Sequence, residues 1–163
     1  MSKRTEITKE LSFLLEKYIN PKNDTRIYMA KEVTFDYATG HAIRVDYVRF
    51  KPVNNTVSGI EKGDFYCYEI KSSVEDFHSG HGLNFIGDYN YLVMPKEVYM
   101  IVQKEIAYFV GVIVPTENNW HNLEVIKKAK RRNREKPLSE MLFMMFRSAA
   151  RDKYKLSQIK YKN

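Results

Sequence analysis

Hydrophobic and polar positions recur with two different periods along the chain, which predicts both helices and strands. From Thr5 to about Ile19 the apolar residues return every three or four positions, as on the buried stripe of a helix, and Asn20-Pro21 ends the pattern. Three strand-like segments follow and predict an antiparallel meander. The strands are expected at 26–36, 41–52 and 64–71, with a turn at 37–41 and a loop at 53–63.

The second half of the chain alternates short helices with apolar strands. A short helix capped by Ser72 and Ser73 is expected to break at Gly80 and Gly82. Further strands are expected at 89–94, 107–115 and 123–129, a helix at 96–105, and a last helix from Pro137 to about Lys155. With 163 residues and no linker or repeat, the pattern predicts one α/β domain spanning residues 1–163.

The composition narrows the function classes. No run of 18 or more apolar residues exists, so no membrane-spanning helix is expected. The lone cysteine, Cys67, rules out a disulfide within the chain and any site that needs several thiolates, and it favours a reducing, cytoplasmic setting.

The net charge of +7 is unevenly distributed. Residues 121–163 carry thirteen Lys/Arg against four Asp/Glu, whereas residues 1–120 carry fourteen against sixteen. A basic C-terminal part on a nearly neutral body suits a phosphate-rich polymer as partner. The alternative is a basic, solvated face that has no partner.

The residues with the strongest chemical pattern are Asp46, Glu69 and Lys71. Side chains alternate across a strand, so Glu69 and Lys71 are expected to point to the same face at a strand end. Asp46 lies inside an apolar strand, where a carboxylate is costly to bury without a cation or hydrogen bonds. A meander brings the two strands together, so the two carboxylates are expected to converge.

Two carboxylates that share a small site repel each other unless a divalent cation lies between them. Oxygen ligands of this kind suit Mg²⁺ or Mn²⁺, and a nearby lysine can orient water or stabilise charge on a phosphate. The simpler alternative is a cross-strand salt bridge of Lys71 with Asp46 or Glu69, since Glu-x-Lys is a short and common pattern.

The order of these pieces resembles a known superfamily. A helix, a strand with Asp46, a strand with Glu69-Ile70-Lys71, then helix and strand is similar to the core of PD-(D/E)XK nucleases. The segments YEIKSSVEDF, NYLVMP, YFVGVIVP and LEVIKKAKRRN resemble the MmcB-like branch, which is linked to DNA repair and also found in phage genomes. The likeness covers roughly residues 27–135, although Arg44-Val45 precede Asp46 where the class name has proline.

The resemblance implies a restriction-endonuclease-like mixed sheet flanked by helices, and it implies roles for the site residues. Asp46 and Glu69 would hold Mg²⁺ or Mn²⁺ together with the backbone carbonyl of Ile70, and Lys71 would be the catalytic lysine. The superfamily often adds a glutamate from the first helix. Glu10 lies nearer to the apolar stripe than Glu6 or Glu16, which favours it as this ligand over a solvated role.

Two further segments are candidates for contact with nucleic acid. The basic run at 127–134 is expected to bind phosphates without regard to sequence. The glycine-rich segment around His81 and Asn84 either shapes the mouth of the cleft or is a structural turn, and His78 with His81 lacks a third zinc ligand nearby. The cations expected to contact nucleic acid are Lys127, Lys128, Lys130, Arg131 and Arg132.

Together these features predict a metal-dependent deoxyribonuclease acting in DNA repair or phage DNA metabolism. The main alternative is an inactive nucleic-acid-binding protein on the same fold. A weaker one is an unrelated basic interaction protein in which Glu-x-Lys is only a salt bridge. The methionines and phenylalanines of the last helix are expected to form core or a dimer face, and a homodimer would let one small domain act on both strands.

Overall fold

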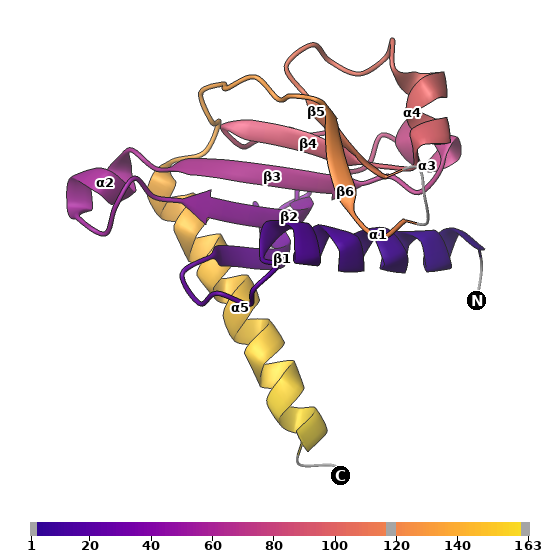
Figure 1. The fold of residues 1–163 in the computed structure, drawn as a ribbon. Coiled ribbons are helices and arrows are strands. Elements are labelled where there is room, and N and C mark those ends of the chain that lie inside the picture. Colours follow the sequence, from indigo (N-terminus) through magenta and orange to yellow (C-terminus); the bar gives the residue numbers. More distant parts are fainter. Residues whose placement is uncertain (1–2, 117–119, 161–163) are drawn as a thin grey trace.

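The computed structural model describes residues 3–116 and 120–160, except for the side chains of Lys3 and Lys160. A six-stranded sheet forms the centre of the fold, with its strands in the order β1-β2-β3-β4-β5-β6 (Figure 1). The strands are β1 (Tyr28–Phe35), β2 (Ile43–Lys51), β3 (Asp64–Ile70), β4 (Tyr89–Val93), β5 (Gly111–Pro115) and β6 (Leu123–Lys127). The helices are α1 (Lys3–Ile19), α2 (Val57–Glu61), α3 (Val74–His78), α4 (Lys96–Val102) and α5 (Leu138–Lys160).

The sheet is mixed. Strands β1, β2 and β3 form the expected antiparallel meander, β3, β4 and β5 run parallel, and β6 returns antiparallel to β5. The parallel pairs need crossovers, and α3 and α4 provide them. The expected α/β architecture with a mixed sheet flanked by helices is therefore confirmed.

Helices cover the two faces of the sheet and create its cores. Helix α1 packs its apolar stripe, including Leu11 and Leu15, against Tyr68 and Ile70 of β3. Helix α5 packs Met141 against the opposite face, in the cluster that holds Phe65 and Cys67. Helices α3 and α4 enclose a third cluster over β4 and β5. Because alternate residues of β3 serve opposite faces, Glu69 lies on the face that α1 does not cover.

Some expected boundaries are corrected by the structure. The segment expected as loop 53–63 contains helix α2, whose first turn is capped by the Thr56 hydroxyl accepting from Gly59 N–H at 3.1 Å. The strand expected from residue 107 begins only at Gly111, because Val110 N–H closes a turn onto the Ala107 carbonyl. Helix α5 runs beyond the expected end, to Lys160.

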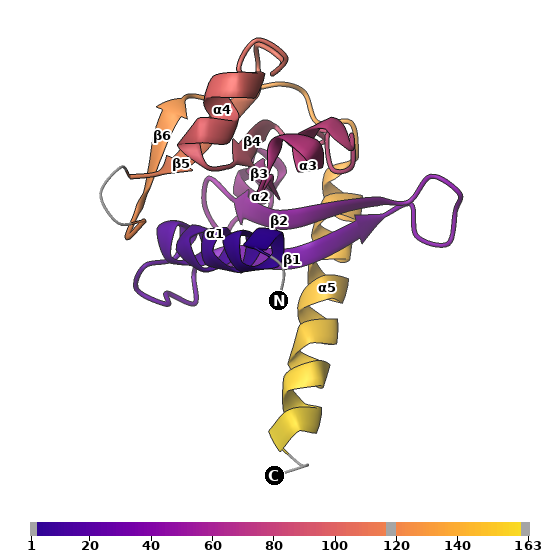
Figure 2. The same ribbon diagram turned by 90° about the vertical axis from the view of Figure 1, so that its right-hand side faces the viewer.

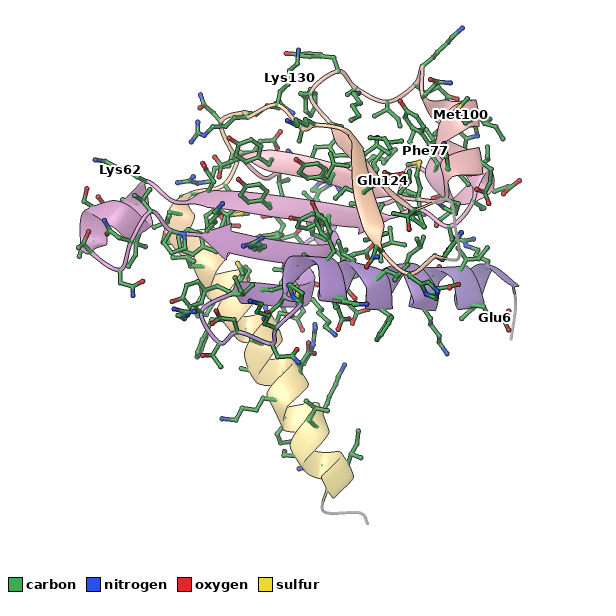
Figure 3. All side chains as sticks on the ribbon, viewed as in Figure 1. Glu6, Lys62, Phe77, Met100, Glu124 and Lys130 are labelled. Atoms are coloured by element: carbon green, nitrogen blue, oxygen red, sulfur yellow. The ribbon has the colours of Figure 1, made fainter. Side chains whose placement is uncertain are left out.

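The two ends of β3 lie in different surroundings, and this separation positions the site. At its start the strand follows α2 and meets the loop after β6, which Figure 1 shows returning to that end of the sheet. At its finish the strand leads into α3, on which Figure 3 labels Phe77. Seven residues of strand separate these ends by roughly 20 Å.

No helix within residues 3–116 and 120–160 is long and apolar enough to cross a membrane.

Candidate active site

A cavity of about 740 Å³ opens where β3 ends, and the three residues predicted to be catalytic line it. Asp46 enters from β2, Glu69 lies at the end of β3, and Lys71 follows that strand directly. The structure thus brings Asp46, Glu69 and Lys71 into one cavity, as the alternation of side chains and the meander led us to expect.

Asp46 is held in place by the backbone of β3. Its Oδ2 accepts a hydrogen bond of 2.9 Å from the Ile70 N–H. The pairing of β2 with β3 ends at Tyr47 and Tyr68. Asp46 therefore lies one residue beyond the paired strands, opposite Glu69. A carboxylate at this point satisfies a strand N–H that no β2 carbonyl reaches, which fixes its direction.

Glu69 is almost fully buried, with 6% of its surface exposed. Burial raises the pKa of its carboxyl group to about 9, and the neighbouring charge of Asp46 adds to the rise in pKa, against the opposing effect of Lys71. The two carboxyl groups are close enough to share a side-chain hydrogen bond. A group in this setting needs a proton or a cation to be stable.

Lys71 is also buried, with 3% exposed, and its ammonium donates to the backbone carbonyl of His81. The segment that carries this carbonyl passes over Glu69. A Cβ added to Gly82 would lie 2.4 Å from Glu69 Oε2, and Gly82 has φ +72, a conformation that favours glycine. Glycine is therefore required where the backbone meets the carboxylate. His81 and Asn84 line the same cavity, as expected for residues at its mouth.

The cavity residues that were not singled out from the sequence include Asp76 and Arg4. Asp76 of α3 accepts from Arg4 of α1 through Oδ1 at 2.6 Å, and its Oδ2 accepts from the Ser72 N–H at 3.0 Å. Ser73 caps the same helix by accepting from the Asp76 N–H. The Ser-x-x-Asp spacing of a reciprocal capping motif was the available signal. Because both oxygens of Asp76 are engaged, it orders the cavity wall and joins α1 to α3.

Glu10 does not join the other expected ligands. Its side chain is exposed on α1, whereas the residues of that helix that line the cavity are Arg4 and Thr8. The packing of α1 explains this result, since Leu11 and Leu15 face the sheet and turn Glu10 outward. Within residues 3–116 and 120–160, no group of three or more His, Cys, Asp or Glu residues is arranged to hold a metal ion. The acidic residues that line the cavity are Asp46, Glu69 and Asp76, and both carboxylate oxygens of Asp76 are already hydrogen-bonded to Arg4 and Ser72.

The basic run does not lie at this cavity. Arg131 pairs with Asp64 at 3.0 Å, at the start of β3, and therefore at the far end of that strand from Glu69. Arg134 pairs at 3.1 Å with Asp88, which is 1% exposed. Three more cations of the run have partners: Lys127 Nζ donates to the Ala107 carbonyl at 2.9 Å, Lys130 lies over the Tyr108 ring, and Arg132 lies over the Phe109 ring.

The basic run therefore lies outside the cavity, and its expected contact with phosphates stays a prediction. Several of its cations form ion pairs with aspartates at the start of β3 and before β4, or lie over aromatic rings. The run is therefore not a cluster of unpaired cations. Lys128 and Lys130 remain exposed (Figure 3 labels Lys130). His78, the first residue of the His-x-x-His pattern, bonds Glu105 at 2.9 Å.

Comparison with known proteins bears on the fold of the chain. No family model matches the chain, and no curated protein matches it. A solved structure of similar fold is the SPO1766 protein of unknown function from Silicibacter pomeroyi, with a TM-score of 0.60 and 15% identity over 94% of this chain and 90% of that one. At this identity the likeness is one of fold: an α/β protein with a six-stranded mixed sheet.

Proposed function

We propose that the protein is a nuclease that hydrolyses DNA phosphodiester bonds with Mg²⁺ or Mn²⁺. The observation that carries the proposal is the convergence of Asp46, Glu69 and Lys71 in one cavity at the end of β3. The resemblance of this strand order and of the YEIKSSVEDF segment to the PD-(D/E)XK superfamily, in its MmcB-like branch, supports DNA as the substrate. A role in repair or in phage DNA metabolism, and a cytoplasmic location, belong to the same proposal.

The donor set fits a hard divalent cation. Asp46 and Glu69 offer carboxylate oxygens, and Ile70 lines the cavity between them and offers a backbone carbonyl. Mg²⁺ commonly takes one or two carboxylates and keeps several waters, so a third acidic ligand such as Glu10 is not required. The raised pKa of Glu69 supports this assignment, because a cation would replace the proton that the buried carboxyl now needs.

Lys71 is the residue suited to the transition state. Its ammonium is buried beside Glu69, where water screens it weakly and where a fixed positive charge acts strongly on an approaching phosphate. The ammonium donates a hydrogen bond to the His81 carbonyl. A bound cation supplies Lewis-acid polarisation of the phosphate, and Lys71 positions water or stabilises the charge that develops on the oxygens.

The decisive experiment compares two lysines that make the same kind of hydrogen bond. Lys71→Met removes the ammonium at the cavity, and Lys127→Met removes one that donates to the Ala107 carbonyl from edge strand β6, outside the cavity lining. Cleavage of single-stranded, nicked, branched and duplex DNA is measured with Mn²⁺ and with EDTA. We expect Lys71→Met to lower the rate at least about a hundredfold and Lys127→Met to leave it nearly unchanged.

The same assay separates the proposal from its main rival. Wild-type protein that binds DNA but cleaves none of these forms would be an inactive nucleic-acid-binding protein on this fold. Exposed Lys128 and Lys130 are proposed as accessory phosphate contacts. Replacing both by Ala is expected to reduce the slope of log affinity against log salt by about 1.8 for duplex DNA, from roughly 0.9 per contact. An unchanged slope would assign them to a solvated face.

A further inference from the structure

Helix α5 extends well beyond the body of the protein. Its first half packs on β1 and the adjoining core, where Met141 and Met145 are buried and Ser148 donates to the Lys31 carbonyl. Its last turns project away from every other element, as both views show (Figures 1 and 2). In this projecting part Leu156 is 64% exposed and Ile159 60% exposed. Most helical stability in proteins comes from packing of an apolar face, so the exposed Leu156 and Ile159 favour a partner surface on this segment.

A groove lies beside the base of the same helix. It has a volume of about 430 Å³ and runs between α5 and the edge formed by β1, β2 and α2. Its walls are almost entirely apolar, and Phe146, 69% exposed, and Tyr28, 42% exposed, stand at its surface. Exposed apolar side chains that gather around one groove mark an interaction surface.

The groove and the projecting part of α5 belong to one heptad seam. Apolar residues spaced alternately by three and four positions place one continuous stripe along a helix that pairs with another helix. The a positions are Leu142, Ala149 and Leu156, and the d positions are Leu138, Met145, Asp152 and Ile159. Leu142, Met145 and Ala149 line the groove, whereas Leu156 and Ile159 continue the same stripe past the body.

We infer that this seam joins two copies of the chain through antiparallel pairing of their α5 helices. In such a pair the a positions of one helix face the d positions of the other. Leu156 then faces Met145 of the second copy, and Ile159 faces Leu142 of the second copy. The projecting part of each helix therefore covers the groove of the other copy. The contact is self-complementary and closes after two chains, as a two-fold dimer requires.

The surface available matches the needs of a dimer. Tyr28, Phe146, Leu156 and Ile159 each leave on the order of 100 Å² of apolar surface in water, which is roughly 400 Å² per copy. Apolar atoms make up about 60% of such interfaces, so the whole contact is about 700 Å² per copy. This is close to the ~800 Å² per partner of an interface of standard size. The single polar seam residue, Asp152, fits the role of setting the register.

The mass of the protein in solution tests the dimer. Sedimentation equilibrium over a wide range of protein concentration is expected to give twice the chain mass of 19.3 kDa at high concentration. The double variant Leu156→Asp and Ile159→Asp is expected to be monomeric. Tyr154→Asp is the matched control, because Tyr154 is 66% exposed on the same projecting segment but lies on the side away from the seam. A monomeric wild type, or a control as disruptive as the double variant, would overturn the inference.

Cross-linking tests the direction of pairing. Ile159→Cys and Leu142→Cys are prepared separately, mixed and oxidised, and the native Cys67 is buried. Antiparallel pairing is expected to give a disulfide between the two different variants and none with Ile159→Cys alone. A disulfide formed by Ile159→Cys alone would show parallel pairing and would refute the arrangement. Neither measurement depends on cleavage, so the dimer and the proposed activity stand or fall separately.

Discussion

Oδ2 of Asp46 accepts a 2.9 Å hydrogen bond from the backbone N–H of Ile70, one residue after Glu69. This bond ties the carboxylate of one strand to the backbone of the next, at the point where the pairing of β2 with β3 has ended. It therefore fixes the Asp46 carboxylate against the β3 backbone, next to Glu69.

The first prediction follows from that bond. In Asp46→Asn an amide oxygen can still accept from the Ile70 N–H, so the site geometry is retained while one negative charge is lost. We expect Mn²⁺ affinity, measured by isothermal calorimetry, to fall at least about tenfold, as for other disturbed metal shells. Thermal stability without metal is expected to be unchanged or higher, because the charge that opposes ionisation of Glu69 is gone. Unaltered Mn²⁺ binding would show that Asp46 is no ligand.

Two glycines of one loop give a matched pair for the second prediction. Gly80 and Gly82 both have positive φ, +73 and +72, but a Cβ on Gly80 meets nothing within 4 Å while one on Gly82 meets Glu69 Oε2 at 2.4 Å. Each Ala variant is expected to lose about 1 kcal/mol from backbone strain. Gly82→Ala is expected to lose more, and also to lose cation binding and cleavage. Equal losses in both variants would remove the loop from any role in shaping the site.

The third prediction concerns the ion pairs at the other end of β3. Asp88 is buried, its Oδ2 accepts from the Phe65 N–H at 2.8 Å, and Arg134 pairs with it. Arg134→Ala is expected to cost about 2–3 kcal/mol in the free energy of unfolding, because the remaining ion pair of the buried Asp88 carboxylate, with Arg131, is 3.7 Å long. Lys128→Ala, an exposed control from the same run, is expected to stay within about 0.5 kcal/mol. Urea denaturation of both variants measures the difference.

The convergence of Asp46, Glu69 and Lys71 could be predicted from the sequence because it depends on one strand and its neighbour. Alternation along β3 puts Glu69 and Lys71 on one face, and a meander makes β2 the neighbour of β3, so Asp46 follows. Glu10 was misplaced because its position depends on the rotation of α1 against the sheet. That rotation is set by which apolar side chains pack best, and helical spacing alone left several glutamates near the boundary of the stripe.

The internal partners of the basic run could not be predicted from the sequence for a related reason. Eight neighbouring residues with six cations suggest a single phosphate-binding surface, but the partners of these cations come from other parts of the chain. Asp64 and Asp88 come from segments that only the folded sheet brings beside Arg131 and Arg134. Helix α2 was missed because five residues within a segment rich in Asn, Gly and Ser give no periodic signal, and the cap by Thr56 decides its conformation.

The last prediction concerns the pH dependence of stability in the absence of metal. The pKa of Glu69 is raised from an ordinary 4.5 to about 9 by burial and by Asp46. Between these values the folded protein keeps a proton that the unfolded chain releases, so the folded state loses stability as pH rises. The stabilisation from this proton is complete below the pKa of Glu69 in the unfolded chain. It is lost as pH rises through the pKa of Glu69 in the folded protein. The free energy of unfolding in EDTA is therefore expected to fall from pH 5 to pH 9.

Glu69→Gln isolates this effect, because glutamine keeps the size of the side chain and cannot ionise. The fall in unfolding free energy between pH 5 and pH 9, measured by urea denaturation, is expected to be smaller in this variant than in wild type. Histidines and other groups titrate in both proteins and cancel in the difference. Mn²⁺ is expected to reduce the fall in wild type and to leave the variant nearly unaffected, since a cation takes the place of the proton on Glu69. Parallel curves for the two proteins would mean that Glu69 ionises normally in the folded state and that no cation is needed beside Asp46.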